Sequence, residues 1–241
     1  MSIRIEADIH THTIASGHAY GTIREMMQEA RDRGLKLYGH AEHSPGTPGA
    51  CDPLYFLNLK VVPREIYGVE LLHGCEINVL NGGRLDLKER YIRPLDYAIA
   101  GVHGVCYENE GRIRNTENLI DCMKHEKVFF VSHPDDDHTP LDYELLTEAA
   151  RKYHVALEVN NSSFKKADKR LNMFDNYRTM LRLCREKEVC IFLGSDAHDP
   201  SAVGDVELAA DFVEEQDFPR ELILNTDAEK LKEFIGYKGR S

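Results

Sequence analysis

Alternating apolar and polar residues open the chain, and short apolar blocks recur along it. The odd positions from Ile3 to Ile9 are apolar and the even ones polar, a period-two pattern that predicts a strand running up to His10 and His12. Apolar blocks predict further strands at about residues 35–41, 69–79, 96–102, 128–132, 155–159 and 189–193. We therefore expect about seven strands.

Segments with helical spacing separate these blocks. Thr22 with Glu25 three residues later is a capping-box pattern, and it predicts a helix that ends near Gly34. Thr139 before Pro140 predicts another helix start. Further helices are expected at about 116–127, 175–188, 203–215 and 227–236, the last with a Thr-x-x-Glu cap that begins at Thr226. Residues 44–67 show no clear pattern.

This alternation of strands and helices across short connections indicates parallel β-α-β units. No repeat or linker divides residues 1–241, so we expect a single domain. Seven or eight such units can close into a barrel or form an open doubly wound sheet, and the pattern alone does not separate these. The glycine fingerprints of dinucleotide and P-loop sites are absent, which weakens the open nucleotide-binding sheet.

Composition limits the partners of the protein. A formal net charge of −11 argues against a general binder of nucleic acid or anionic membranes. The chain has no signal-peptide pattern and no apolar run of membrane-spanning length, and its six scattered cysteines form no Cys-x-x-Cys pair. We expect a cytoplasmic protein with reduced cysteines. Its twelve histidines are the one unusual feature.

The histidines and several carboxylates gather at the expected C-terminal ends of the strands. His10 and His12 are two residues apart on a strand and so face the same side, and Asp196 and His198 repeat this spacing on a segment expected to be extended. In parallel α/β folds, ligands and metals bind at that edge. Metal ligation therefore explains the set better than solvated histidines do: His10, His12, His18, His43, Glu76, His103, His133, Asp196 and His198.

Imidazole and carboxylate ligands without thiolate suit zinc, manganese or iron. Nine ligands with one bridging carboxylate would hold three divalent ions at three or four protein ligands each. A structural zinc site uses four protein ligands, whereas a catalytic one keeps a position open. The count therefore favours a hydrolase.

Eight stretches of the sequence resemble the PHP (polymerase and histidinol phosphatase) superfamily, above all its small bacterial phosphatases of the YcdX type. They follow the order of the family across nearly the whole chain: Asp8–His12, His18–Tyr20, Glu42–His43, Glu76–Asn78, Gly101–His103, Ser132–Pro134, Leu157–Phe164 and Gly194–His198. The resemblance implies a distorted (β/α)7 barrel with a trinuclear metal centre at the C-terminal ends of its strands, with zinc as the first choice of metal.

The resemblance also implies how the ligands are shared. The three groups are His10, His12, Glu76 and Asp196; the bridging Glu76 with His103 and His133; and His18, His43 and His198. Glu42 departs from the family, in which Asp usually precedes the histidine, and we expect this change to affect the orientation of His43 rather than ligation. His40 and His138 have no equivalent in the family pattern.

The expected reaction is hydrolysis of a small phosphate monoester by a metal-bound hydroxide. Glu76, His43 and Asp196 would take part through that hydroxide and its metal ions. Candidate contacts to the rest of the substrate lie in loops after the strands, where solvated charges are the alternative interpretation: Arg112, Arg114 and Lys165, together with Lys166 and Arg170.

Other functions stay open at this point. A histidinol-phosphate phosphatase would use the same site with different substrate loops, and a non-catalytic domain would bind metal without turnover. A phosphodiesterase or nuclease is disfavoured by the acidic net charge and the lack of a basic stripe. An amidohydrolase barrel also begins with His-x-His, but the full ligand pattern with Glu76 fits it less well.

Overall fold

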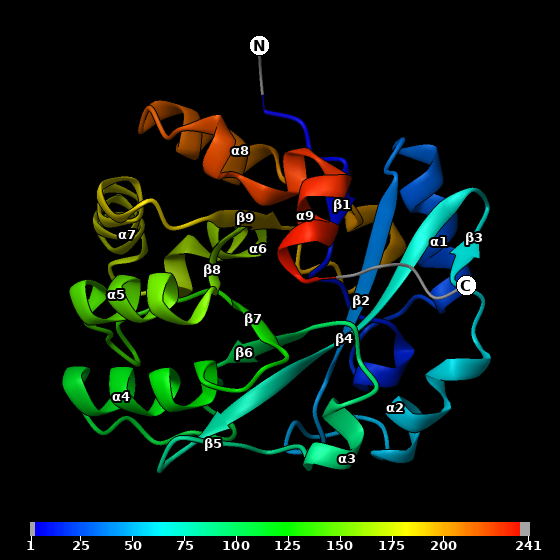
Figure 1. The fold of residues 1–241 in the computed structure, drawn as a ribbon, viewed down its shortest axis with the longest axis horizontal. Helices are drawn as coiled ribbons and strands as arrows, with labels where there is room; N and C mark the ends of the chain where they lie inside the picture. The colour runs from blue at the N-terminus through cyan, green and yellow to red at the C-terminus, as the bar shows by residue number, and fades with distance from the viewer. Residues whose placement is uncertain (1–2, 237–241) are drawn as a thin grey trace.

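The computed structural model describes residues 3–236, and its framework is a sheet of seven parallel strands (Figure 1). Their order in the sheet is β1-β2-β4-β6-β7-β8-β9. The bounds are β1 (Ala7–Asp8), β2 (Leu37–His43), β4 (Val69–Leu80), β6 (Ala98–Gly101), β7 (Val128–Val131), β8 (Ala156–Asn160) and β9 (Ile191–Gly194). All seven predicted strands are present, although only two residues of the first one pair with a neighbour.

The sheet curls until β9 returns to β1, so the barrel is nearly closed. The backbone N–H of His12 donates to the Ala197 carbonyl at 2.8 Å. Elsewhere along the two strands, the Asn225 side chain fills the gap between them: it donates to the carbonyls of Ala7 (2.9 Å) and Leu193 (2.7 Å) and accepts from the Leu193 N–H (3.0 Å). The predicted barrel is confirmed, and the open sheet is excluded.

Packed side chains fill the barrel interior. Tyr97 is fully buried there, and a Cβ atom added to Gly74 would lie only 2.3 Å from its ring. Its hydroxyl donates to the Ile9 carbonyl at 2.7 Å, and its ring meets Phe130 edge to face with centroids 5.6 Å apart. The interior is a solid core, which fixes the strands whose ends carry the candidate site.

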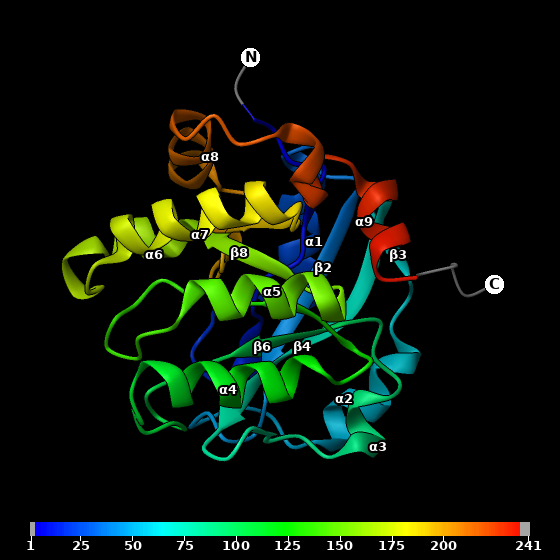
Figure 2. The same cartoon turned by 60° about the vertical axis from the view of Figure 1, so that its left-hand side comes forward.

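Helices cover the outside of the barrel, with α4, α5 and α7 stacked along one side (Figures 1 and 2). The longer helices are α1 (Ile23–Asp32), α4 (Arg112–Met123), α5 (Tyr143–Tyr153), α7 (Met173–Lys187), α8 (Glu207–Glu215) and α9 (Ala228–Phe234). The shorter elements are α2 (Leu54–Asn58), α3 (Glu89–Ile92), α6 (Asn161–Lys165), and the strands β3 (Glu65–Ile66) and β5 (Arg84–Leu85), which pair antiparallel with β4. The unpatterned stretch 44–67 thus holds α2 and β3.

One of the three predicted helix starts is confirmed. The Thr22 side chain accepts from the backbone N–H of Glu25, whose carboxylate accepts from the Thr22 N–H at 2.8 Å. The start predicted at Thr139 is wrong, because α5 begins after Asp142. The cap predicted at Thr226 is also wrong, because the next residue, Asp227, accepts the free N–H groups of α9. Aspartate is the stronger cap, so it takes the position from a nearby threonine.

Two expectations from composition concern the whole molecule. All six cysteines are free. Among residues 3–236, no helix combines the length and the apolar character needed to cross a bilayer.

Candidate metal centre

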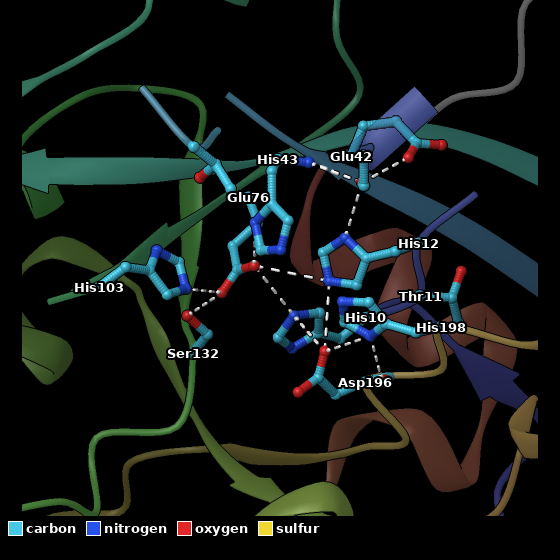
Figure 3. A network of polar contacts seen from close by, with 12 residues as sticks. His10, Thr11, His12, Glu42, His43, Glu76, His103, Ser132, Asp196 and His198 are labelled. Carbon is cyan, nitrogen blue, oxygen red and sulfur yellow. Dashed lines mark hydrogen bonds and ion pairs between the residues drawn. The ribbon is translucent and has the colours of Figure 1, made fainter. Parts of the chain in front are cut away.

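All nine predicted ligands converge at the C-terminal ends of the barrel strands. Figure 3 labels seven of them, all except His18 and His133. They come from six of the strands or from the loops that follow them, because parallel strands present their carboxyl ends at one edge. Glu76 lies within β4, and His43 is the last residue of β2. The others follow strands: His10, His12 and His18 follow β1, His103 follows β6, His133 follows β7, and Asp196 and His198 follow β9.

The carboxylate of Glu76 is the centre of the cluster. Its Oε1 atom lies 3.2 Å from Nε2 of His103 and 3.0 Å from Nε2 of His133. Its Oε2 atom faces three other rings, at 3.4, 3.5 and 3.0 Å from nitrogens of His10, His12 and His43. With histidines on both oxygens, this buried carboxylate has the geometry of a bridge between two cations.

Asp196 supplies the second carboxylate. Its Oδ1 atom lies 3.3 Å from Nε2 of His12 and 3.6 Å from Nε2 of His10. The expectation of an extended segment is wrong at this residue, since Asp196 has φ +53°, in the left-handed region. His133 is also at positive φ, +27°. Such strain in residues other than glycine is common at functional sites, where the surroundings impose it.

Hydrogen bonds at the outer edge of two rings fix their tautomers. Nδ1 of His10 lies 2.6 Å from a Glu158 carboxylate oxygen. Nδ1 of His103 lies 2.6 Å from Oδ1 of Asn78, and the Asn78 amide donates to Asp86 at 2.9 Å, which orients its oxygen toward the ring. Because the acceptor takes the Nδ1–H, the Nε2 atom of each neutral ring carries a lone pair aimed into the centre.

Ser16 and Glu42 organise the loop that carries His12. Nδ1 of His12 donates to the Ser16 hydroxyl (3.1 Å), which also accepts from the His43 N–H (3.0 Å) and donates to Glu42 (2.7 Å). Glu42 accepts from the Thr13 N–H as well, at 3.0 Å. Burial alone would raise the pKa of Glu42, but the neighbouring His40 and the hydroxyls of Ser16 and Thr13 hold that pKa at about 2, so it stays a carboxylate. Glu42 reaches His43 through Ser16, which accepts the His43 backbone N–H.

His18 and His198 form the outer end of the cluster. Their Nε2 atoms lie 3.0 Å apart. Nδ1 of His18 faces the Ser16 carbonyl at 3.1 Å, and Nδ1 of His198 faces the Asp196 carbonyl at 2.9 Å. Carbonyl oxygens only accept, so both rings carry their proton on Nδ1 when neutral. Two lone pairs then face each other across 3.0 Å, and a cation between them satisfies both.

Charge sets the protonation of the buried rings when no cation is present. Burial alone would lower the pKa of His10, but the carboxylates of Glu158, Glu76 and Asp196 raise it well above the usual value. The pKa of Glu76 and that of Asp196 lie well below their usual range, although burial opposes this, because of the facing histidines. The pKa of His12 falls to about 3 through burial and the neighbouring His43.

The unsatisfied atoms of the site fit a metal. Four buried ligand atoms lack a hydrogen-bond partner within the described residues: Nε2 of His10, Nε2 of His12, Nδ1 of His43 and Oε2 of Glu76. Such groups cost free energy unless something pairs them. Three sets of ligand atoms lie mutually within 4.8 Å: His12, His43 and His198; His10, His12 and Glu76; and His43, Glu76 and His103. These sets overlap the implied groups without reproducing them, so the sharing of ligands stays a prediction.

Comparison with known proteins decides the family. No protein-family model matches the chain. A "Probable phosphatase" of Clostridium novyi (strain NT) is 39% identical over 234 residues, 97% of this chain and 95% of the relative. Another, from Thermoanaerobacter sp. (strain X514), is 40% identical over 240 residues, 99% of this chain and 97% of the relative. The chain belongs to the family of these probable phosphatases.

A solved structure shares the fold. The histidinol phosphate phosphatase (HISK) of Lactococcus lactis subsp. lactis Il1403, complexed with zinc, L-histidinol and phosphate, aligns with a TM-score of 0.61 and 18% identity. The alignment covers 88% of this chain and 94% of that one. At this identity the likeness concerns the barrel itself.

A cavity of about 720 Å³ opens onto the candidate metal centre. The predicted substrate contacts lie outside its lining: Arg112 donates to the Leu141 carbonyl at 3.0 Å, Arg114 pairs with Glu117 and Lys165 pairs with Asp205. The expectation that they lie in loops is wrong, because Arg112 and Arg114 belong to α4 and Lys165 ends α6. Their role in substrate binding stays a prediction. Lys166, Arg170 and His138 do line the cavity, whereas His40 is buried 3.0 Å from a ring nitrogen of His73.

Sequence reasoning assigned no role to the residues that hold the ligands in place. Glu158, Asn78, Ser16 and Ser132 each bond to a ligand side chain, Ser132 through Oε1 of Glu76 at 2.6 Å. One signal was available, since Glu158 is a carboxylate between apolar residues of a strand. A charge on a fully buried strand needs a partner.

Proposed function

We propose that this protein is a YcdX-type phosphatase that hydrolyses small phosphate monoesters with three divalent metal ions, zinc in the first place. One observation carries the proposal. The Nε2 atoms of His18 and His198 face each other at 3.0 Å while both Nδ1 atoms bond to carbonyls, an arrangement that calls for a cation at the partly exposed end of the cluster. A cation there borders the cavity rather than the closed core, which suits catalysis.

Ions bound at this centre would supply positive charge for phosphoryl oxygens and a water that loses its proton near neutral pH. The side chains of the protein prepare the centre for them. Glu76 holds two groups of histidines at a fixed separation through its two oxygens. Glu158, Asn78 and Ser16 hold the outer ring nitrogens, so the ligands need little reorganisation.

Arg170 is the residue best placed to bind the phosphoryl group beside the metal ligands. It lines the cavity, and its guanidinium pairs with the buried carboxylate of Asp135 at 3.1 Å. Burial alone would lower the pKa of Arg170, but Asp135 and, more weakly, Asp196 raise it, so it lies within the field of the metal-site carboxylate. A fixed guanidinium with free N–H groups matches phosphoryl oxygens.

Metal analysis and a hydrolysis assay together test the proposal. Protein purified without chelators should contain divalent metal by mass spectrometry and should hydrolyse 4-nitrophenyl phosphate. His12→Ala removes a ligand that is fully buried in the cluster, so we expect hydrolysis to fall by more than about a hundredfold. His125→Ala is the matched control, because His125 pairs with Glu89 away from the site.

The outcomes separate the alternatives. Metal-free protein, or an unchanged rate in His12→Ala, would overturn the proposal. Full metal loading without hydrolysis of any phosphate ester would favour the non-catalytic metal-binding domain instead.

A further inference from the structure

We infer that the cavity beside the metal centre selects phosphate monoesters whose leaving group carries a second anionic group, a carboxylate or another phosphate, which binds to Lys166. The inference rests on the proposed phosphatase function and adds a substrate class to it. It depends on the size of the cavity, on how the charges in its lining are paired, and on the contrast between two adjacent lysines.

The cavity is too large for a phosphoryl group alone. Its volume of about 720 Å³ falls in the range that holds a whole small-molecule ligand. Beside the candidate metal ligands, the lining includes the apolar side chains of Val102, Leu119 and Leu141. The leaving group therefore has an apolar surface to contact.

Most carboxylate oxygens of the other acidic groups in the lining already have partners. Oδ1 of Asp135 pairs with Arg170 at 3.1 Å, and Oδ2 is buried, with no hydrogen-bond partner among residues 3–236. Oδ1 of Asp136 lies 2.7 Å from Nδ1 of His138 and accepts the backbone N–H groups of His138 and Leu171, each at 3.0 Å. A cationic leaving group would have to compete with these contacts. The lining therefore gives a positive substituent little to bind.

Lys166 is the contrasting group. It is exposed and lines the cavity, and within residues 3–236 its ammonium makes no hydrogen bond or ion pair. Its backbone is anchored just after α6, where its N–H donates to the Ser163 carbonyl at 3.1 Å. The neighbouring Lys165 points elsewhere, to Asp205 at 2.6 Å. Lys166 thus offers three donors and a full charge to an anion that enters the cavity.

The surroundings of Arg170 and Lys166 indicate different tasks for the two cations. Arg170 is held by Asp135, two residues after the candidate ligand His133, in the part of the lining that also contains candidate metal ligands. The Lys166 side chain is exposed and can follow a ligand of variable length. We therefore assign the phosphoryl group to Arg170 and the second anion to Lys166.

Binding of non-hydrolysable phosphonates to the zinc-loaded protein tests this assignment by calorimetry. The probes are ω-carboxyalkylphosphonates of increasing chain length, with alkylphosphonates and ω-aminoalkylphosphonates of matched length. At the best length, the carboxylate should tighten binding about fivefold, the size expected of a solvent-exposed ion pair. Lys166→Met should abolish that gain, and Lys166→Glu should shift the preference to the amino series. Lys165→Met is the matched control and should keep the gain.

Three results would overturn the inference: equal binding of all three series at every length, equal weakening of every probe by Lys166→Met, or no phosphonate binding at all. The second result would mean that Lys166 contacts the phosphoryl end. Phosphonates bind without turnover, so the selectivity can be measured even if 4-nitrophenyl phosphate is not hydrolysed. Selective phosphonate binding without hydrolysis would reject the phosphatase proposal and retain the anion site at Lys166.

Discussion

Glu158 and His10 form a fully buried pair in which a carboxylate oxygen lies 2.6 Å from Nδ1 of the ring. The other oxygen of Glu158 accepts the backbone N–H of His133 at 2.7 Å. One carboxylate therefore fixes a ligand that follows β1 and the backbone of a ligand that follows β7. The positions of His10 and His133 therefore both depend on β8, which carries Glu158.

Replacing this carboxylate by an amide should weaken metal binding. In Glu158→Gln the amide can turn its NH2 group toward His10, which favours the tautomer with the proton on Nε2. We expect zinc affinity to fall by about 10- to 100-fold, measured by competition with a chelator of known affinity. Glu148→Gln is the control, because Glu148 is exposed beside Lys187. An unchanged affinity in Glu158→Gln would contradict the orienting role.

Asp86 should act on the metal centre through Asn78. Asp86 accepts from the Asn78 amide at 2.9 Å and thereby directs Oδ1 of Asn78 to His103. In Asp86→Asn the Asn78 carboxamide loses this preference, and we expect zinc affinity to fall about tenfold. Asp175→Asn, at an exposed position of α7, should leave it unchanged. Equal affinities in the two variants would show that the amide orientation is set by other contacts.

Metal binding near neutral pH should release protons. In the metal-free protein, the carboxylates around His10 raise its pKa well above the usual value, so this ring is protonated at pH 7. A ligating ring must be neutral, and its proton leaves when metal binds. With one proton released, the apparent affinity should rise about tenfold per pH unit as pH increases through the neutral range. Calorimetry in buffers of different ionisation enthalpy measures the release. In Glu158→Gln the release should be smaller, and a pH-independent affinity of the wild type would refute the prediction.

The barrel should depend on Asn225 for its closure. This side chain makes three hydrogen bonds to the backbones of Ala7 and Leu193. Asn225→Ala leaves these buried groups unpaired, and we expect the free energy of unfolding to fall by about 3 kcal/mol in urea titrations. Asn58→Ala, at the exposed end of α2, is the control. A loss no larger than that of the control would mean that β1 and β9 hold together without the bridge.

The pattern of the sequence was sufficient to predict parallel β-α-β units and the group of candidate ligands, whereas the closed barrel was implied only by the family resemblance. Strand and helix periods repeat in alternation, and the carboxyl ends of parallel strands must meet at one edge, so His43, Glu76 and His103 could be expected together without coordinates. Helix starts were less certain, since Thr139 and Asp142 lie three residues apart and both are cap formers. The stronger cap former, Asp142, begins α5.

The tertiary structure decided what surrounds each ligand and where the side chains of Lys165 and Lys166 point. Glu158, Asn78 and Ser16 lie far from most of their partners in sequence or on other elements, and no period relates them. Lys165 and Lys166 are adjacent and chemically identical, yet one pairs with Asp205 and the other lines the cavity. Local patterns record which face of an element is buried. The direction of a long side chain at a helix end depends on partners that only the folded chain brings within reach.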